Sequence, residues 1–79
     1  MEIKVLGTGC SRCKQLYDNT KKAVEALKLN DQIEYVTDVL KIVETGLMST
    51  PGLMINNKIV AAGRVPGEKE IIDLIQKNR

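Results

Sequence analysis

The 79-residue sequence contains no histidine, no tryptophan and no phenylalanine, and its only aromatic residues are Tyr17 and Tyr35. Proteins that bind nucleic acid usually concentrate basic residues on one face or stack bases on aromatic side chains. Here the formal net charge is only +2, and the lysines and arginines are interspersed with acidic residues. We therefore expect no nucleic-acid partner.

Long apolar segments are also missing. The longest uncharged apolar runs, such as residues 59–62, span only a few positions, whereas a membrane-spanning helix needs about 20. Residues 1–5 lack the basic segment and following apolar stretch of a secretory signal. We therefore expect no membrane segment and a cytoplasmic location. With 43% apolar and 28% charged residues, and without linkers or repeats, residues 1–79 are predicted to form a single domain.

Both cysteines, Cys10 and Cys13, lie in one short segment and are three positions apart. In a cytosolic protein such a CxxC is more often catalytic or metal-binding than structural. A closed zinc site needs four ligands, so two cysteines and no histidine would require dimerisation to complete it. A soft-metal (zinc or copper) binding module remains an alternative to redox chemistry. A purely structural disulfide is a third reading, although closing a four-residue loop stabilises by only about 2 kcal/mol.

The cysteines fall where an expected strand gives way to a long expected helix beginning at Ser11. The first N–H groups of a helix lack intrahelical acceptors and carry partial positive charge, which stabilises a thiolate. Arg12 and Lys14 add cations there. We therefore expect the Cys10 thiol to be exposed, with a pKa below the ordinary value of about 8.5, and Cys13 to lie on the buried face of the helix.

The remaining pattern alternates strand and helix. Asp38 is a plausible N-cap for a short helix, and Asn56-Asn57 suits the tight turn of a hairpin. Strands are predicted at residues 3–6, 33–37, 53–55 and 58–62, and helices over residues 11–28, from 38 to about 46, and from 68 to the C-terminus.

Each predicted helix has an apolar side that we expect to pack against the rest of the domain. Leu47 and Met48 are assigned to the core, with an apolar rim for partner proteins as the alternative. The apolar sides comprise Cys13, Leu16, Tyr17, Thr20, Val24 and Leu27 in the first helix, Val39, Ile42 and Val43 in the second, and Ile71, Ile72, Leu74 and Ile75 in the third.

The order βαβαββα, with CxxC after the first strand and Thr50-Pro51 before the third, resembles the thioredoxin fold. More narrowly, the chain is similar to small thioredoxin-like or glutaredoxin-like "redox-active disulfide" proteins of archaea and bacteria. These carry TGCxxC, TPG and a glycine after the fourth strand, which here are residues 8–13, residues 50–52 and Gly63. The resemblance covers the whole chain. It implies an α/β minimal thioredoxin fold with three helices and a four-stranded mixed sheet in the order second, first, third, fourth strand.

This resemblance implies a thiol-disulfide oxidoreductase in which Cys10 is the nucleophile and Cys13 the resolving thiol. It implies no cofactor beyond the redox-active Cys10–Cys13 disulfide. The implied partners are protein disulfides and an upstream thiol reductase, and the implied state is a monomer. The residues expected to contact substrate are Thr8, Gly9, Ser11, Arg12, Thr50, Pro51 and Gly63.

Pro51 is expected, on the same resemblance, to be a cis proline facing the disulfide. A proline also biases the preceding residue toward extended backbone, so Thr50 is expected to offer its backbone groups to an incoming strand. The chain departs from ordinary thioredoxins in three places. No tryptophan precedes Cys10, Ser11-Arg12 replaces Gly-Pro, and Lys4 stands roughly where an acid is expected.

Overall fold

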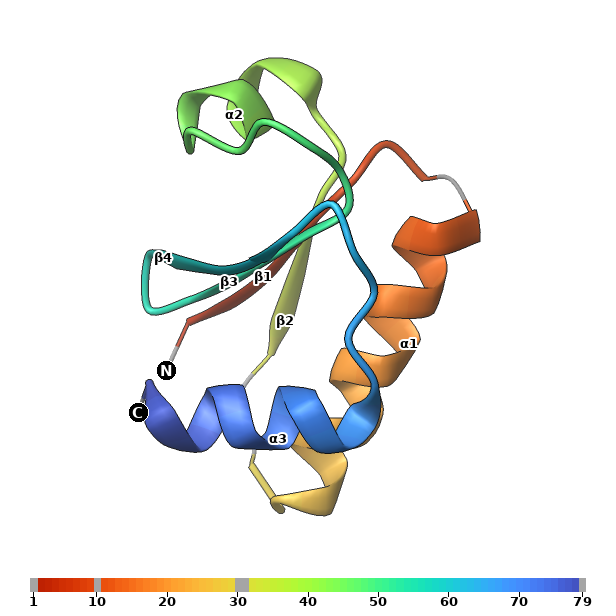
Figure 1. Ribbon diagram of the computed structural model, residues 1–79, viewed down its shortest axis with the longest axis vertical. Coiled ribbons are helices and arrows are strands. Elements are labelled where there is room, and N and C mark those ends of the chain that lie inside the picture. Colours follow the sequence, from red (N-terminus) through yellow and green to blue (C-terminus); the bar gives the residue numbers. More distant parts are fainter. Residues whose placement is uncertain (1, 10, 30–31, 79) are drawn as a thin grey trace.

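The structure is a computed structural model that describes residues 2–9, 11–29 and 32–78. Its helices and strands follow the order βαβαββα expected from the sequence (Figure 1). None of the helices in this described part is long and apolar enough to cross a membrane. The elements are β1 (Ile3–Leu6), α1 (Ser11–Ala26), β2 (Ile33–Val36), α2 (Val39–Glu44), β3 (Gly52–Ile55), β4 (Lys58–Ala62) and α3 (Glu68–Lys77).

The four strands form one mixed sheet in the order β2-β1-β3-β4. β1 runs parallel to β2, because α1 carries the chain back between them, and antiparallel to β3. β3 and β4 form an antiparallel hairpin. Its two turn residues, Asn56 and Asn57, have φ values of 51° and 66°, the left-handed conformation that a tight hairpin turn requires. The predicted strand order and hairpin are therefore confirmed.

The sheet is covered unequally on its two faces. α1 and α3 pack on one face, and α2 lies at the other side, near one end of the strands (Figure 1). Successive residues of a strand point to opposite faces, so β1 sends Ile3 and Val5 into the larger core and Leu6 into the smaller one. The smaller core contains only Leu6, Val36, Ile42, Leu47 and Met54 as buried residues in the described part of the chain.

The buried side of α1 agrees with the predicted spacing, because Cys13, Leu16, Thr20 and Val24 are all buried. The helix ends at Ala26, two residues earlier than predicted. At that end Lys28 has a φ of 56°, and its N–H and that of Leu29 donate to the carbonyls of Glu25 and Val24. This pattern is a Schellman motif, which terminates a helix by turning one residue into the left-handed region.

α2 begins as predicted, since the Asp38 carboxylate accepts a hydrogen bond of 2.9 Å from the Leu40 N–H. The predicted apolar side is wrong for two of its three residues. Ile42 is buried, but Val39 and Val43 are 58% and 63% exposed. α2 has only six residues, and Ile42 is the one side chain of this helix that is buried in the core.

The two adjacent apolar residues after α2 also differ in burial. Leu47 is buried, as predicted, whereas Met48 is 94% exposed, so its assignment to the core is wrong. Leu47 occupies the space above Gly52, where an added Cβ atom would lie 2.6 Å from a Leu47 Cδ atom. Leu47 fills this space, and the side chain of the next residue, Met48, lies in solvent.

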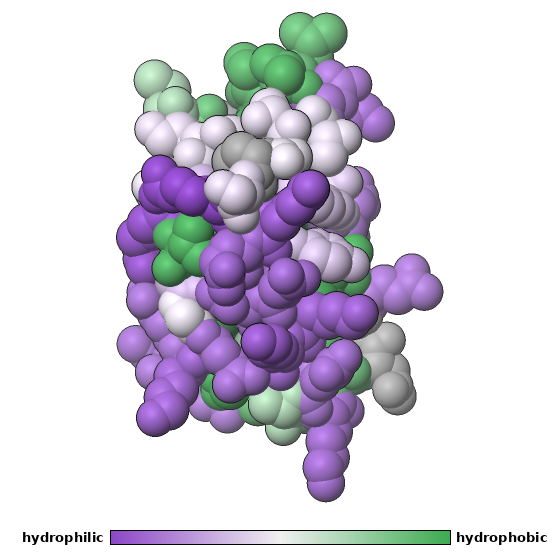
Figure 2. Space-filling view, turned by 90° about the vertical axis from the view of Figure 1, so that its right-hand side faces the viewer, coloured by the Kyte–Doolittle hydropathy of each residue, from purple (hydrophilic) through white to green (hydrophobic). Residues whose placement is uncertain are grey.

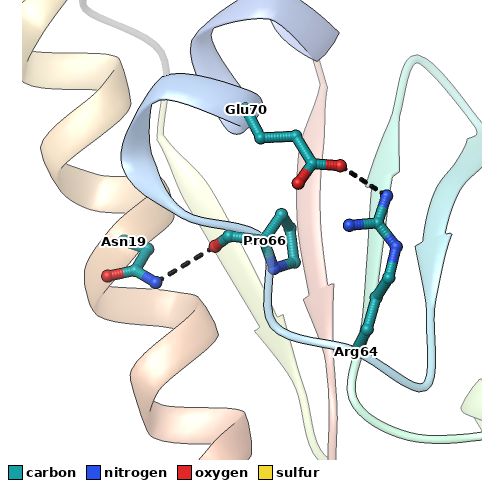
Figure 3. Close-up of polar contacts among 4 residues, drawn as sticks. All are labelled: Asn19, Arg64, Pro66 and Glu70. Atoms are coloured by element: carbon teal, nitrogen blue, oxygen red, sulfur yellow. Dashed lines mark hydrogen bonds and ion pairs between the residues drawn. The ribbon is translucent and has the colours of Figure 1, made fainter.

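The loop between β4 and α3 is tied to both helices that cover the larger core (Figure 3). The Asn19 side chain donates to the Pro66 carbonyl at 3.1 Å, and Arg64 pairs with Glu70 at 2.6 Å. The hydrogen bond from Arg64 lowers the pKa of the Glu70 carboxyl and raises that of the guanidinium. Both side chains are about half exposed, so water and salt screen the pair.

A group whose pKa is lowered on folding stabilises the protein above its unfolded pKa and loses that contribution as the pH falls through its folded pKa. We therefore expect Glu70→Gln to lower the melting temperature slightly at pH 7 and to have no effect at pH 2, well below the ordinary glutamate pKa of about 4.3. Glu68→Gln is the matched control, because Glu68 lies in the same first turn of α3. An equal effect of both variants at pH 7 would assign the loss to the helix dipole instead of Arg64.

Candidate functional site

The turn from β1 to α1 brings the chain from the sheet into the CxxC helix within a few residues. Gly7 directly follows β1 and is still hydrogen-bonded to the sheet, because its N–H donates to the Val36 carbonyl at 3.0 Å. Thr8 and Gly9 are exposed, and Gly9 has a φ of +92°, which favours glycine. Cys10, the predicted nucleophile, lies outside the described residues, so its expected exposure stays a prediction.

Cys13 lies in the first turn of α1, and its side chain is 0% exposed, as the helical spacing predicted. It packs directly on the backbone of Gly7. A Cβ atom added at Gly7 would collide with the Cys13 Sγ atom and would lie 2.7 Å from its Cβ atom. The absence of a side chain at position 7 therefore allows α1 to start against the end of β1 with Cys13 inside.

A chain of two hydrogen bonds joins three of the predicted substrate-contacting residues. The Arg12 guanidinium donates to the Gly63 carbonyl at 3.1 Å, and the Gly63 N–H donates to the Pro51 carbonyl at 2.8 Å. These residues come from α1, from the end of β4 and from the segment before β3. Arg12, Gly63 and Pro51 are thus brought together although they are distant in the sequence.

The segment before β3 contains Pro51, whose peptide bond with Thr50 is cis, as the resemblance implied. Pro51 is buried, while Ser49 and Thr50 are exposed. Within the described part of the chain, neither the N–H nor the carbonyl of Thr50 takes part in a backbone hydrogen bond. Gly63 has a φ of +70°, and an added Cβ atom there would lie 3.0 Å from Ser49 Cβ, so a residue with a side chain would be strained at this position.

Charge at the start of α1 is uniformly positive among the described residues. The first turn contains no acidic side chain, and Ser11, Arg12 and Lys14 are all exposed. A helix N-terminus ordinarily favours acids, so these cations suit an anion held at this end of the helix. The described hydrogen bonds do not connect Thr8, Gly9 or Ser11 to Pro51 or Gly63.

Two residues of this region were not singled out for the roles the structure gives them. Gly7 packs against Cys13, and Ser49 lies beside Gly63. Nothing in a single sequence marks a glycine as a packing surface for a cysteine six positions later. Among the described residues, no group of three or more His, Cys, Asp or Glu side chains is placed to hold a metal ion.

Residues 1–76 match the thioredoxin domain family. The chain belongs to the thioredoxin family. It is 45% identical over 69 residues to a thioredoxin of Methanocaldococcus jannaschii, a match that covers 87% of this chain and 79% of that protein. It is 35% identical over 71 residues to a thioredoxin of Methanothermobacter thermautotrophicus, covering 90% of this chain and 92% of the relative. The resemblance inferred from residues 8–13, residues 50–52 and Gly63 is therefore confirmed at the level of the family.

The close contact between Gly7 and Cys13 predicts how a substitution at position 7 changes the stability of this thioredoxin-family chain. Gly7→Ala should destabilise the fold by about 1–3 kcal/mol, because an extra methyl in a filled space forces its neighbours apart. Chemical denaturation measures this loss. The control is Gly67→Ala, where an added Cβ meets nothing within 4 Å. Alanine at position 67 caps α3 less well than glycine, which destabilises the protein, but it also lowers the conformational entropy of the unfolded chain, which stabilises it. We expect these effects to nearly cancel, so that the free energy of unfolding changes by no more than about 0.5 kcal/mol. Equal effects at the two positions would contradict the packing argument.

Proposed function

We propose that this thioredoxin-family chain is a dithiol–disulfide oxidoreductase that reduces or exchanges disulfides of partner proteins. One observation carries the proposal. A fully buried Cys13 stands in the first turn of α1, three positions after a second cysteine, at the end of the molecule where Arg12 and Gly63 link that helix to Pro51. A buried thiol behind an accessible one is the arrangement that attack followed by internal resolution requires.

In the proposed reaction, the Cys10 thiolate attacks one sulfur of the substrate disulfide. The substrate S–S bond breaks, its second sulfur leaves as a thiolate, and a mixed disulfide with Cys10 forms. The Cys13 thiolate then attacks the Cys10 sulfur and expels the remaining substrate sulfur. The substrate gains two electrons and two protons, and the CxxC loses them and becomes a disulfide. A thiol reductase upstream would return it to the dithiol, in a cytoplasmic setting.

Substrate docking is proposed at Thr50. Thr50 is exposed and has no backbone hydrogen-bond partner among the described residues, which favours pairing with an extended segment of the substrate. Thr8, Gly9, Ser11 and Arg12 would border that segment on one side, and Pro51 and Gly63 on the other. The protein would act as a monomer, and no cofactor beyond the two cysteines is needed.

The roles of the two cysteines are tested by separate substitutions. Cys10→Ser should abolish reduction of insulin, because the attacking sulfur is gone. Cys13→Ser should instead accumulate a mixed disulfide, because the resolving sulfur is gone, and mass spectrometry of the trapped species reads this out. Retained turnover in Cys10→Ser would refute the assignment. Stoichiometric zinc or copper in protein purified under reducing conditions would favour the soft-metal alternative.

The electrostatics of the helix start predict the acidity of the nucleophile. We expect the pKa of Cys10 to lie below about 8.5, measured as the pH midpoint of its alkylation by iodoacetamide in the reduced protein. Lys14→Gln should raise that midpoint, because it removes a cation from the first turn of α1. Lys22→Gln, which removes another exposed cation further along the same helix, should leave the midpoint unchanged. A midpoint unchanged in Lys14→Gln would show that its charge does not reach the sulfur.

A further inference from the structure

Two exposed cations at the start of α1, Arg12 and Lys14, have no acidic partner among the described residues. The ion pair found in the described part of the chain joins Arg64 to Glu70, so the cation that directly follows Gly63 is already paired. Figure 2 looks at the side of the molecule on which Figure 1 places α1, and that side is largely hydrophilic. Uncompensated positive charge therefore remains beside the proposed substrate segment.

Arg12 differs from Lys14 because its side chain is held in place. Its guanidinium donates to the Gly63 carbonyl at 3.1 Å, which directs the charge from α1 toward the end of β4. No hydrogen bond or ion pair to a described residue holds the Lys14 ammonium. A side chain that is already ordered loses less conformational entropy when a ligand binds it. Arg12 is therefore the better preorganised of the two cations.

The Arg12 guanidinium has donors left for a second acceptor. A guanidinium carries five N–H groups in a planar fork, and the hydrogen bond to Gly63 uses the Nη2 atom. Arg12 is exposed, so its remaining donors are open to a ligand from solvent. The acceptor that matches this fork best is a carboxylate, because two parallel N–H···O bonds can form.

The surroundings of Arg12 indicate which molecule would carry that carboxylate. The Gly63 N–H donates to the Pro51 carbonyl at 2.8 Å, and Pro51 directly follows Thr50, where an extended segment of the substrate is proposed to pair. Arg12 also follows the proposed nucleophile, Cys10, by two positions in the sequence. A side chain next to the reactive cysteine of the substrate would therefore be within reach of the guanidinium.

A free anion would not be held by this contact alone, because one exposed ion pair raises affinity by only about fivefold at most. An acidic side chain on a substrate that is already paired at Thr50 binds intramolecularly, so the same small gain appears directly in the rate constant. α2 offers no comparable positive surface, since its charged residues Lys41 and Glu44 and its cap Asp38 are of mixed sign.

We propose that Arg12 is a specificity-determining residue: it binds a carboxylate next to the reactive cysteine of the substrate, and so gives the enzyme a preference for disulfides with acidic residues there. This inference rests on the proposed function. Recognition by Arg12 is separate from any effect of its charge on Cys10, because a change in the thiolate fraction of Cys10 alters the rates with all disulfides by the same factor.

The test compares two peptide disulfides that differ only in charge. Each is the symmetric disulfide of a short peptide with a single cysteine, flanked on both sides by glutamate in one peptide and by glutamine in the other. The second-order rate constant for single-turnover reduction by the reduced protein is measured for both. Each value is divided by the rate constant with which dithiothreitol reduces the same disulfide, because this corrects for the intrinsic reactivity of the peptide sulfur.

We expect wild type to reduce the glutamate peptide about fivefold faster than the glutamine peptide. Arg12→Gln should lower this ratio to about 1, because the anchoring charge is gone. Lys22→Gln, which removes an exposed cation further along α1, should keep the wild-type ratio. High salt should reduce the ratio of wild type, since salt screens exposed charges.

A wild-type ratio near 1, or a ratio that Arg12→Gln leaves unchanged, would overturn the inference and leave the proposed oxidoreductase intact. An equal fall of the ratio in Lys22→Gln would assign the preference to the net charge of the chain, which also overturns it. Arg12→Met, which keeps a long side chain without the charge, should behave as Arg12→Gln does, and thermal melts establish that both variants are folded. A wild type that reduces neither peptide nor insulin would refute the proposed function itself.

Discussion

The contact between the backbone of Gly7 and the buried side chain of Cys13 is the constraint on which the site depends. It allows the first turn of α1 to stand against the end of β1. The position of Arg12 follows from it, because Arg12 directly precedes Cys13 and reaches the Gly63 carbonyl from there. Gly63 in turn donates to Pro51. One close approach therefore sets the geometry of three segments that are distant in sequence.

The two faces of the sheet serve different purposes. α1 and α3 bury the larger core, and the loop between β4 and α3 is tied to both by Asn19 and by the Arg64–Glu70 pair. α2 and the segment after it cover the other face with little more than Ile42 and Leu47. Residues that stabilise the domain are thus largely separate from the exposed residues 48–50.

The charges of the two longer helices contrast in an informative way. α3 follows the ordinary preference of the helix dipole, with Glu68 and Glu70 in its first turn and Lys77 in its last. α1 reverses it, with Arg12 and Lys14 near its start and no described acid in the first turn. A local rule broken at one helix and kept at another within the same chain is characteristic of a functional site.

Much of the local structure was determined by the sequence alone. Asp38 caps its helix, Asn56 and Asn57 turn the hairpin, and the spacing of apolar residues in α1 places Cys13 inside. These features depend on residues within a few positions of one another, so they can be predicted from neighbours. The strand order followed from the resemblance carried by residues 8–13, residues 50–52 and Gly63, and the structure bears it out.

Only the tertiary structure decided which apolar side chains of residues 39–48 are covered, and that Gly7 and Arg12 have packing and hydrogen-bonding roles. Arg12 and Gly63 are 51 positions apart. Leu47 is buried above Gly52, whereas its neighbour Met48 is exposed. Burial and long-range hydrogen bonds depend on which segments meet in space. A short sequence pattern does not specify which distant segments come into contact. The same apolar residue is therefore buried or exposed according to what packs on it.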